Sequence, residues 1–374
     1  MICPRIPKYS LLSLLILIIS GCSGITKITD AITKPPAREL YKREFKDNPA
    51  AFDSWNLAYQ TALSDSLSVP LPYAEKGFFF RKNAVAYSYN VQMQEGEILT
   101  VEIQKDSIST RVFIDILELK NGKFNSVETN ELGTDALQHP VNDNRIYKVV
   151  VQPELMSNSP FVLIINKRPQ YAFPVAGKGN AAIQSFWGFE RDGGKRSHEG
   201  IDIFAKRGTP VVAVTDGTIS RTGNSGLGGK QVWQRAGLFG NSIYYAHLDS
   251  IVVTEGTKAS LGDTIGFVGN TGNAAGGPTH LHFGIYKNGA VNPLPFVFQT
   301  ETVKITALAN PPKRQKIKLS AKANIRQSPS KTGGILGELT ANDSVSILGL
   351  HKDWLHIKTL TGKSAFLHRN TIGK

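Results

Sequence analysis

Apolar and polar side chains alternate in short runs between residues 78 and 166, with turn residues between the runs. The clearest runs are Leu99–Ile103, Val112–Ile116, Tyr147–Val151 and Phe161–Ile165. Alternation of this kind is typical of half-buried strands, and several short strands separated by turns predict a β-sandwich. The stretch contains no catalytic constellation. We therefore interpret residues 41–168 as an N-terminal accessory domain whose function does not follow from its sequence.

A helical spacing precedes these strands. Between Tyr41 and Leu63, bulky side chains recur at intervals that place them on one face of a helix. The predicted face consists of Phe45, Phe52, Trp55, Tyr59 and Leu63. Residues 22–40 end near the breaker pair Pro35-Pro36 and are interpreted as a tether.

The end of the chain repeats the strand pattern on a smaller scale. Residues 301–316 include the polar, breaker-containing stretch Asn310–Lys316, which predicts a linker. Residues 317–374 contain short apolar runs separated by turns, and they predict a small β module.

Candidate chemistry is concentrated in residues 169–300. His198 and Asp202 flank Gly200, and about eighty residues later His280 and His282 lie two positions apart. In an extended chain, residues two apart share a face, so each pair can point the same way. Gly200 leaves room for an ion between its neighbours.

A hydrolytic zinc site has three protein ligands and one position open to water, and imidazole and carboxylate are suitable ligands. A further imidazole near that water can move protons. His247 is a candidate for this role, and the Gly-rich run 266–278 leads directly into His280. These segments supply the required groups, although spacing alone does not say which of them bind metal.

Several motifs in this region, taken in order, resemble those of the lysostaphin-type zinc endopeptidases, which cut bacterial cell-wall peptides. The resemblance covers about residues 170–298. It is carried by the segments His198–Asp202, Tyr244–Leu248, Gly269–Gly272 and Gly277–Phe283, together with Ile203–Val211 and Val214–Ile219. Thr279, which stands between Pro278 and His280, is a small departure, and we expect the loop to absorb it.

The resemblance implies one Zn²⁺ per chain, with His198, Asp202 and His282 as its ligands. It places the proton-handling and transition-state-stabilising histidines at His247 and His280. On a strand, Tyr245 and His247 are expected to share a face. Glu199 is expected to face away from its neighbours and to be solvated or to lie behind the ligands.

Residues 317–374 resemble a bacterial SH3-like domain, a kind of module that commonly binds cell-wall peptides. Trp354 and Phe366 are candidates for lining a binding groove, and Trp354 is equally compatible with a place in the core.

The N-terminus has the organisation of an export signal. Arg5 and Lys8 precede the apolar run Leu11–Ile19, which is too short for a membrane-spanning helix, and Ser20-Gly21-Cys22 follows. Small residues directly before a cysteine resemble a bacterial lipoprotein signal of residues 1–21, with Cys22 as the lipidated residue. A plain secretory signal with an incidental cysteine is the alternative. Either way we expect an exported protein, and the lipoprotein signal predicts anchoring to the cell envelope, with Ser23 indicating the outer membrane or periplasmic face if the organism is Gram-negative.

Charge and cysteine content agree with this interpretation. The formal net charge is +13, and it falls to about +11 without Arg5 and Lys8. Such an excess suits anionic wall polymers or membrane surfaces, although dispersed basic residues also fit an ordinary solvated surface. No basic helix, finger or aromatic-basic motif indicates nucleic acid. Cys3 and Cys22 are the two cysteines, so the mature chain has no internal disulfide and no thiolate metal site.

Together these patterns predict a mainly β protein. A lysostaphin-type β-sheet peptidase domain, residues 169–300, is flanked by an N-terminal β-sandwich-like domain and a C-terminal SH3-like barrel. The expected function is zinc-dependent hydrolysis of peptide bonds in peptidoglycan stem peptides or cross-links. Two alternatives remain open: a non-catalytic regulator of a cell-wall amidase, and a wall-binding scaffold.

Overall fold

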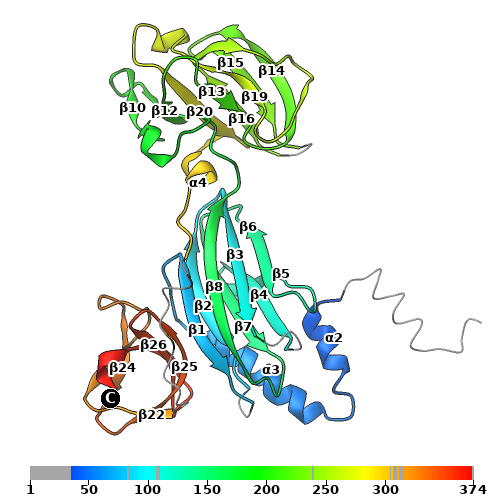
Figure 1. Ribbon diagram of the computed structural model, residues 1–374, viewed down its shortest axis with the longest axis vertical. Helices are drawn as coiled ribbons and strands as arrows, with labels where there is room; N and C mark the ends of the chain where they lie inside the picture. Colours follow the sequence, from blue (N-terminus) through cyan, green and yellow to red (C-terminus); the bar gives the residue numbers. More distant parts are fainter. Residues whose placement is uncertain are drawn as a thin grey trace, which may run out of the picture.

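The computed structural model describes residues 35–81, 84–106, 110–237, 240–303, 305, 310 and 316–372. The chain forms an N-terminal domain, a central domain and a C-terminal module (Figure 1). The predicted signal, Cys22 and most of the predicted tether lie outside the described residues, as does most of the predicted linker 301–316.

The N-terminal domain begins with two helices where the sequence predicted one. They are α2 (Ala37–Arg43) and α3 (Pro49–Ser64). The break falls at residues 44–48 because Pro49 lacks the N–H that a continuous helix would need and instead occupies the first turn of α3. The predicted apolar face survives the break, since Trp55 is buried with Tyr41 and Phe113.

Two four-stranded antiparallel arrays pack face to face in this domain. The first has the order β1 (Tyr73–Phe79), β8 (Ser159–Pro169), β3 (Glu97–Lys105) and β6 (Ala136–Pro140). The second has the order β2 (Tyr87–Met93), β7 (Arg145–Pro153), β4 (Val112–Lys120) and β5 (Lys123–Thr129). One hydrophobic core joins their inner faces. The predicted β-sandwich is therefore confirmed.

The central domain is built on a long antiparallel sheet. Its order is β18 (Lys258–Ala259), β14 (Gly217–Ser225), β15 (Gly229–Arg235), β16 (Ser242–Ala246), β20 (His280–Tyr286), β12 (Ile201–Phe204) and β9 (Ile183–Ser185), and β21 (Ala290–Val291) pairs with β20. A smaller sheet, β13 (Pro210–Val212), β19 (Thr264–Val268) and β17 (Leu248–Ile251), shares its core. The hairpin of β10 (Glu190–Arg191) and β11 (Arg196–Ser197) projects beside β12.

The two ends of the central domain meet. The Tyr171 amide donates to the carbonyl of Phe296 at 2.9 Å, and the two rings stack with centroids 5.6 Å apart. Phe296 belongs to the short helix α4 (Leu294–Val297), which lies between the central and N-terminal domains (Figure 1).

The C-terminal module is a small barrel-like array, as predicted. Its strands are β22 (Lys316–Lys318), β23 (Ala323–Arg326), β24 (Ile335–Leu339), β25 (Ser344–His351), β26 (Trp354–Thr359) and β27 (Ser364–His368). β25 also pairs with β1, with Lys76 opposite Leu350, so the sheet continues from the module into the N-terminal domain.

A buried polar cluster lies at this junction. Glu75 and His356 are 0% and 1% exposed, and the His356 Nδ1 lies 3.1 Å from the Glu75 Oε1. The phenols of Tyr73 and Tyr89 donate to the Glu75 Oε2. Phe366 is fully buried against the same region, in the core of the N-terminal domain. The prediction that Phe366 lines a wall-binding groove is therefore wrong, because the N-terminal domain covers it.

None of the helices in the described part of the chain is long and apolar enough to cross a membrane.

Candidate metal centre and groove

Two neighbouring strands bring the predicted metal ligands together. Asp202 on β12 pairs directly with His282 on β20, so their side chains leave the same face of the sheet. His198 precedes β12, and its amide donates to the carbonyl of Phe189. A Cβ on Gly200 would lie 2.6 Å from the His282 Cε1, so only glycine lets the chain pass this close to the imidazole.

The three side chains converge on a common point. The Asp202 Oδ1 lies 3.0 Å from the His198 Nε2 and 3.0 Å from the His282 Nδ1, and the two nitrogens are 3.1 Å apart. Tetrahedral ligands on zinc bonds of about 2.0–2.1 Å lie roughly 3.3 Å from one another. The observed triangle is therefore within a few tenths of an ångström of the one that zinc requires, and its atoms are the ones zinc prefers. The donor set fits the metal.

Surrounding groups orient these ligands. The His198 Nδ1 lies 2.8 Å from the carbonyl of Phe186, which fixes the proton there and turns the Nε2 lone pair toward the centre. Arg191 donates to the Asp202 Oδ2 at 2.8 Å and also contacts Ser185. One carboxylate oxygen is thus held by the arginine while the other faces the histidines.

The electrostatics keep Asp202 and His282 in the forms that bind metal. Burial raises the pKa of Asp202, but hydrogen bonds and charge from His198 and His282 outweigh it and hold that pKa well below its usual range. Burial lowers the pKa of His282 despite the neighbouring carboxylate. A carboxylate beside a neutral imidazole is the state from which metal binding displaces fewest protons.

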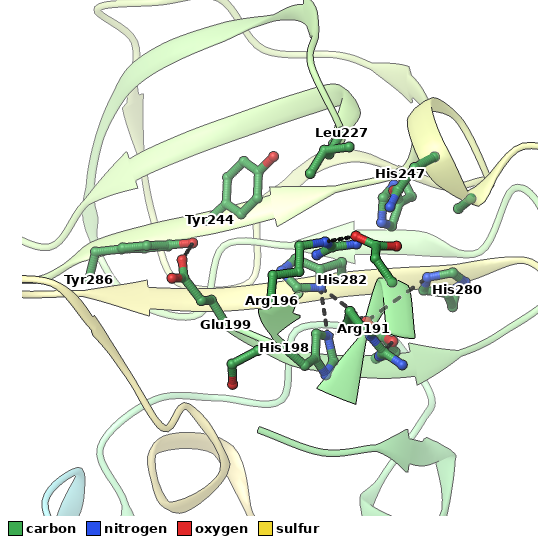
Figure 2. Close-up of a pocket in the computed structure, with 16 residues that line it drawn as sticks. Arg191, Arg196, His198, Glu199, Leu227, Tyr244, His247, His280, His282 and Tyr286 are labelled. Carbon is green, nitrogen blue, oxygen red and sulfur yellow. Dashed lines mark hydrogen bonds and ion pairs between the residues drawn. The ribbon is translucent and has the colours of Figure 1, made fainter. Parts of the chain in front are cut away.

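His247 and His280 lie beside this centre without joining it (Figure 2). Their ring centroids are 5.0 Å apart. In each ring Nδ1 lies 2.9 Å from a backbone carbonyl, Thr271 for His247 and Pro278 for His280. Each ring therefore donates from Nδ1 and retains an Nε2 lone pair. The His280 Nε2 is 4.0 Å from the Asp202 Oδ1, which places it next to the ligands.

The backbone at His247 explains one wrong expectation. β16 ends at Ala246, and His247 has a positive φ of 62°, a conformation that non-glycine residues rarely adopt. This turn reverses the side-chain direction, so Tyr245 is buried in the core while His247 faces the groove. The expected shared face of Tyr245 and His247 is therefore incorrect, and Tyr244 takes the groove position instead.

Burial, reinforced by the charges of His280 and His282, lowers the pKa of His247 to about 4. A neutral His247 can accept a proton or a hydrogen bond at neutral pH.

These residues line one groove of about 600 Å³. Its walls come from segments without a periodic pattern, and sequence reasoning did not identify their contributions. They are Arg191, Asp192 and Arg196 on the β10–β11 hairpin, Leu227 before β15, and Asn273 and Ala274 in the Gly-rich loop. Glu199 is exposed, as expected, yet it also lines the groove.

Residues 196–293 match the model of peptidase family M23, and residues 321–373 match that of the bacterial SH3 domain. The chain therefore contains an M23 peptidase domain. All five predicted site residues in the described part of the chain lie within the M23 match.

Known relatives share this domain rather than the whole chain. The L-Ala--D-Glu endopeptidase of Bacillus subtilis is 35% identical over 127 residues, covering 32% of this chain and 39% of the relative. The murein hydrolase activator NlpD of Salmonella dublin is 34% identical over 135 residues, covering 34% and 32%. The solved catalytic domain of lysostaphin from Staphylococcus simulans is 31% identical, with coverage of 30% and 89% and a TM-score of 0.28. The chain thus spans about two fifths or less of the two curated relatives.

Proposed function

We propose that this protein is a zinc-dependent endopeptidase that hydrolyses peptide bonds in the stem peptides or cross-links of peptidoglycan. The observation that carries the proposal is the convergence of His198, Asp202 and His282 at the floor of an open groove, with two further histidines beside them. The M23 match and the B. subtilis relative, named as an endopeptidase, support the substrate class.

His198, Asp202 and His282 would hold the zinc ion. Zinc in such a site supplies a Lewis acid that activates water and polarises the scissile carbonyl. His247 and His280 present Nε2 atoms to the same space, so they can accept a proton from the attacking water, return it to the leaving amine and stabilise the negative charge that develops on the carbonyl oxygen. Their Nδ1 contacts with backbone carbonyls preset the orientation that these roles need.

A non-catalytic regulator of an amidase is the second candidate, because one relative is named as a murein hydrolase activator. The intact triangle of metal-binding atoms favours catalysis. A wall-binding scaffold is the third candidate, and the SH3 match favours contact with peptidoglycan as partner.

We also propose an exported protein that is lipidated at Cys22 and attached to an envelope membrane, and this rests on the signal sequence alone. Cys22→Ser should move the protein from a detergent-extracted membrane fraction to a soluble exported fraction. A wild-type protein that is already soluble and unmodified at its mature N-terminus would contradict lipidation.

Purified protein incubated with purified cell wall separates the three functions. An endopeptidase clears the wall alone, stops when a chelator removes the metal and resumes when zinc is restored. A regulator clears wall only when an amidase is added, and a scaffold binds wall without clearing it. Mass analysis of the released muropeptides then identifies the bond that is cut.

A further inference from the structure

The groove contains one acidic side chain without a cationic partner. Five charged residues line it. Arg191 pairs with Asp202, and Arg196 pairs with Asp192. Glu199 is left, and it makes no ion pair with any residue that the structure describes. Its contact there is the hydroxyl of Tyr286, 3.5 Å from Oε2.

An unpaired acid in this place stands out because the chain is basic overall, with 43 Lys and Arg against 30 Asp and Glu. A surface with such an excess would readily place a lysine or arginine beside an exposed carboxylate. The two arginines that reach the groove are instead held by aspartates. Glu199 therefore remains available to a positive charge that comes from outside the chain.

Aromatic side chains complete the surroundings of Glu199. Tyr286 lies on β20, on the same face as His282. Gly284 lies between these two residues on β20, and it is paired with Tyr244 on β16. A Cβ on Gly284 would lie 3.1 Å from the Tyr286 ring and 3.6 Å from the Tyr244 Cβ. Glycine therefore leaves space between the two tyrosine side chains. Trp233 packs behind both rings, with its centroid 4.4 Å from that of Tyr244 and 5.2 Å from that of Tyr286.

The tyrosines stay neutral and in place. Burial, followed by the charge of Glu199, raises the pKa of Tyr286 to about 12, so its hydroxyl remains a donor to the carboxylate. The Tyr244 hydroxyl donates to Gln231, which holds its ring beside His282. A carboxylate bordered by aromatic rings is the environment in which an organic ammonium group binds through charge, hydrogen bonds and ring contacts.

We propose that Glu199, Tyr244 and Tyr286 form a subsite for a free ammonium group on the substrate. This inference rests on the proposed peptidase function and adds a specificity to it. In Figure 2, His282 lies between Glu199 and Tyr286 on one side and His247 and His280 on the other. Tyr286 is four residues along the strand from His282, about 13 Å, and its ring reaches back toward Glu199. The ammonium group therefore belongs to a residue near the scissile bond, and a diamino acid with an unlinked side-chain amine is the matching chemistry.

Two synthetic stem peptides test the subsite. They share one sequence that contains a diamino acid, whose side-chain amine is free in one peptide and acetylated in the other. Wild-type protein should cleave the free-amine peptide with a kcat/KM roughly tenfold higher, the size expected for one hydrogen bond to a charged group. Glu199→Gln should lose this preference, because its kcat/KM for the free-amine peptide falls toward its kcat/KM for the acetylated peptide. Glu255→Gln is the matched control, since Glu255 is exposed in the same domain and does not line the groove.

Equal kcat/KM for the two peptides in the wild-type protein would overturn the subsite, as would an equal loss on both peptides in Glu199→Gln. Calorimetric titration of both peptides into zinc-loaded His280→Ala, in which cleavage is slowed, compares their binding directly. A wild-type protein that cleaves neither peptide nor wall refutes the endopeptidase. Equal affinities in the titration refute the ammonium subsite, and a preference for the free amine supports it whether or not the protein is an enzyme.

Discussion

Two clusters of histidine and carboxylate are buried in the part of the chain that the structure describes, and they differ in how their polar atoms are used. At the junction of the N-terminal and SH3 domains, the Glu75 carboxylate receives the His356 ring on one oxygen and two phenols on the other. In the M23 domain, an aspartate oxygen and two imidazole nitrogens all lie within 3.1 Å of one another.

In the junction cluster each oxygen of Glu75 has its own donors and the cluster is closed to solvent, although the His356 Nε2 has no hydrogen-bond partner among the described residues. The M23 cluster cannot be satisfied in this way, because each hydrogen joins only one pair of atoms while three atoms face a common point. It also opens onto a groove. A buried His–carboxylate contact is therefore no sign of a site by itself. Convergence and access distinguish a candidate metal centre from a structural ion pair.

The largest expected effect comes from removing one converging ligand. His282→Ala should abolish stoichiometric zinc and wall lysis together, because two ligands do not hold the ion in place. Elemental analysis and the wall assay measure both quantities, and His198→Ala and Asp202→Ala should behave alike. Full zinc occupancy in His282→Ala would show that this side chain is not a ligand.

The next effect separates chemistry from metal binding within the same cluster. His247→Ala and His280→Ala should keep zinc and fold but lose about two orders of magnitude in rate, the size expected for a proton-transfer or oxyanion group. The double variant should cost less than the sum of the two free-energy costs, since the groups act as a unit. Near-normal turnover in either single variant argues against the proposed role of that histidine. Loss of zinc in His280→Ala would show that His280 is a metal ligand rather than a proton-transfer group.

The junction cluster should respond in stability rather than in activity. Glu75→Gln leaves His356 without its counter-charge and should lower the free energy of unfolding by about 3 kcal/mol, with zinc content unchanged. Denaturant titration measures the change. Glu102→Gln, at an exposed position on β3 of the same sheet, is the control and should have almost no effect. An unchanged midpoint of denaturant unfolding in Glu75→Gln would show that the junction cluster does not stabilise the fold.

The smallest effect is a pH dependence at the junction. Burial raises the pKa of Glu75, but the charge of His356 and hydrogen bonds from His356, Tyr73 and Tyr89 outweigh it and bring that pKa below its ordinary value of 4.5. The folded chain then binds fewer protons than the unfolded chain, so this stability is present above about pH 4.5 and is lost as pH falls further. Between pH 6 and pH 3 the free energy of unfolding should fall less steeply in Glu75→Gln than in the wild-type protein. Parallel curves of the free energy of unfolding against pH would contradict this prediction.

Much of this structure could be predicted from local patterns in the sequence. Alternation predicted the strands that begin near Leu99 and Val112, because each buries one face. The ligand motifs could be interpreted because His282 and Asp202 sit on short strands, where residue spacing fixes direction. The same rule failed at His247. Its positive φ turns the backbone just after β16, so its side chain does not share a face with that of Tyr245.

Other features depend on contacts between distant segments. The pairing of Lys76 with Leu350 joins two domains across most of the chain, and no local pattern encodes it. The burial of Phe366 follows from that pairing. Arg191 and Arg196 reach the groove through a hairpin whose placement depends on β12 and on their ion pairs with Asp202 and Asp192, so their positions could not be predicted.

The contact between Tyr171 and Phe296 brings the two ends of the peptidase domain together, so the domain is inserted in the molecule as one unit. The outgoing and returning segments of the chain are joined by the hydrogen bond from Tyr171 to Phe296 and by one from the Thr300 hydroxyl to the carbonyl of Lys167, while β1 pairs with β25 independently of them. Mounting and chemistry are consequently separable in this architecture. The other two domains can change the reach or orientation of the M23 domain without altering a residue of the groove, and the M23 domain can be exchanged without opening the core beneath it.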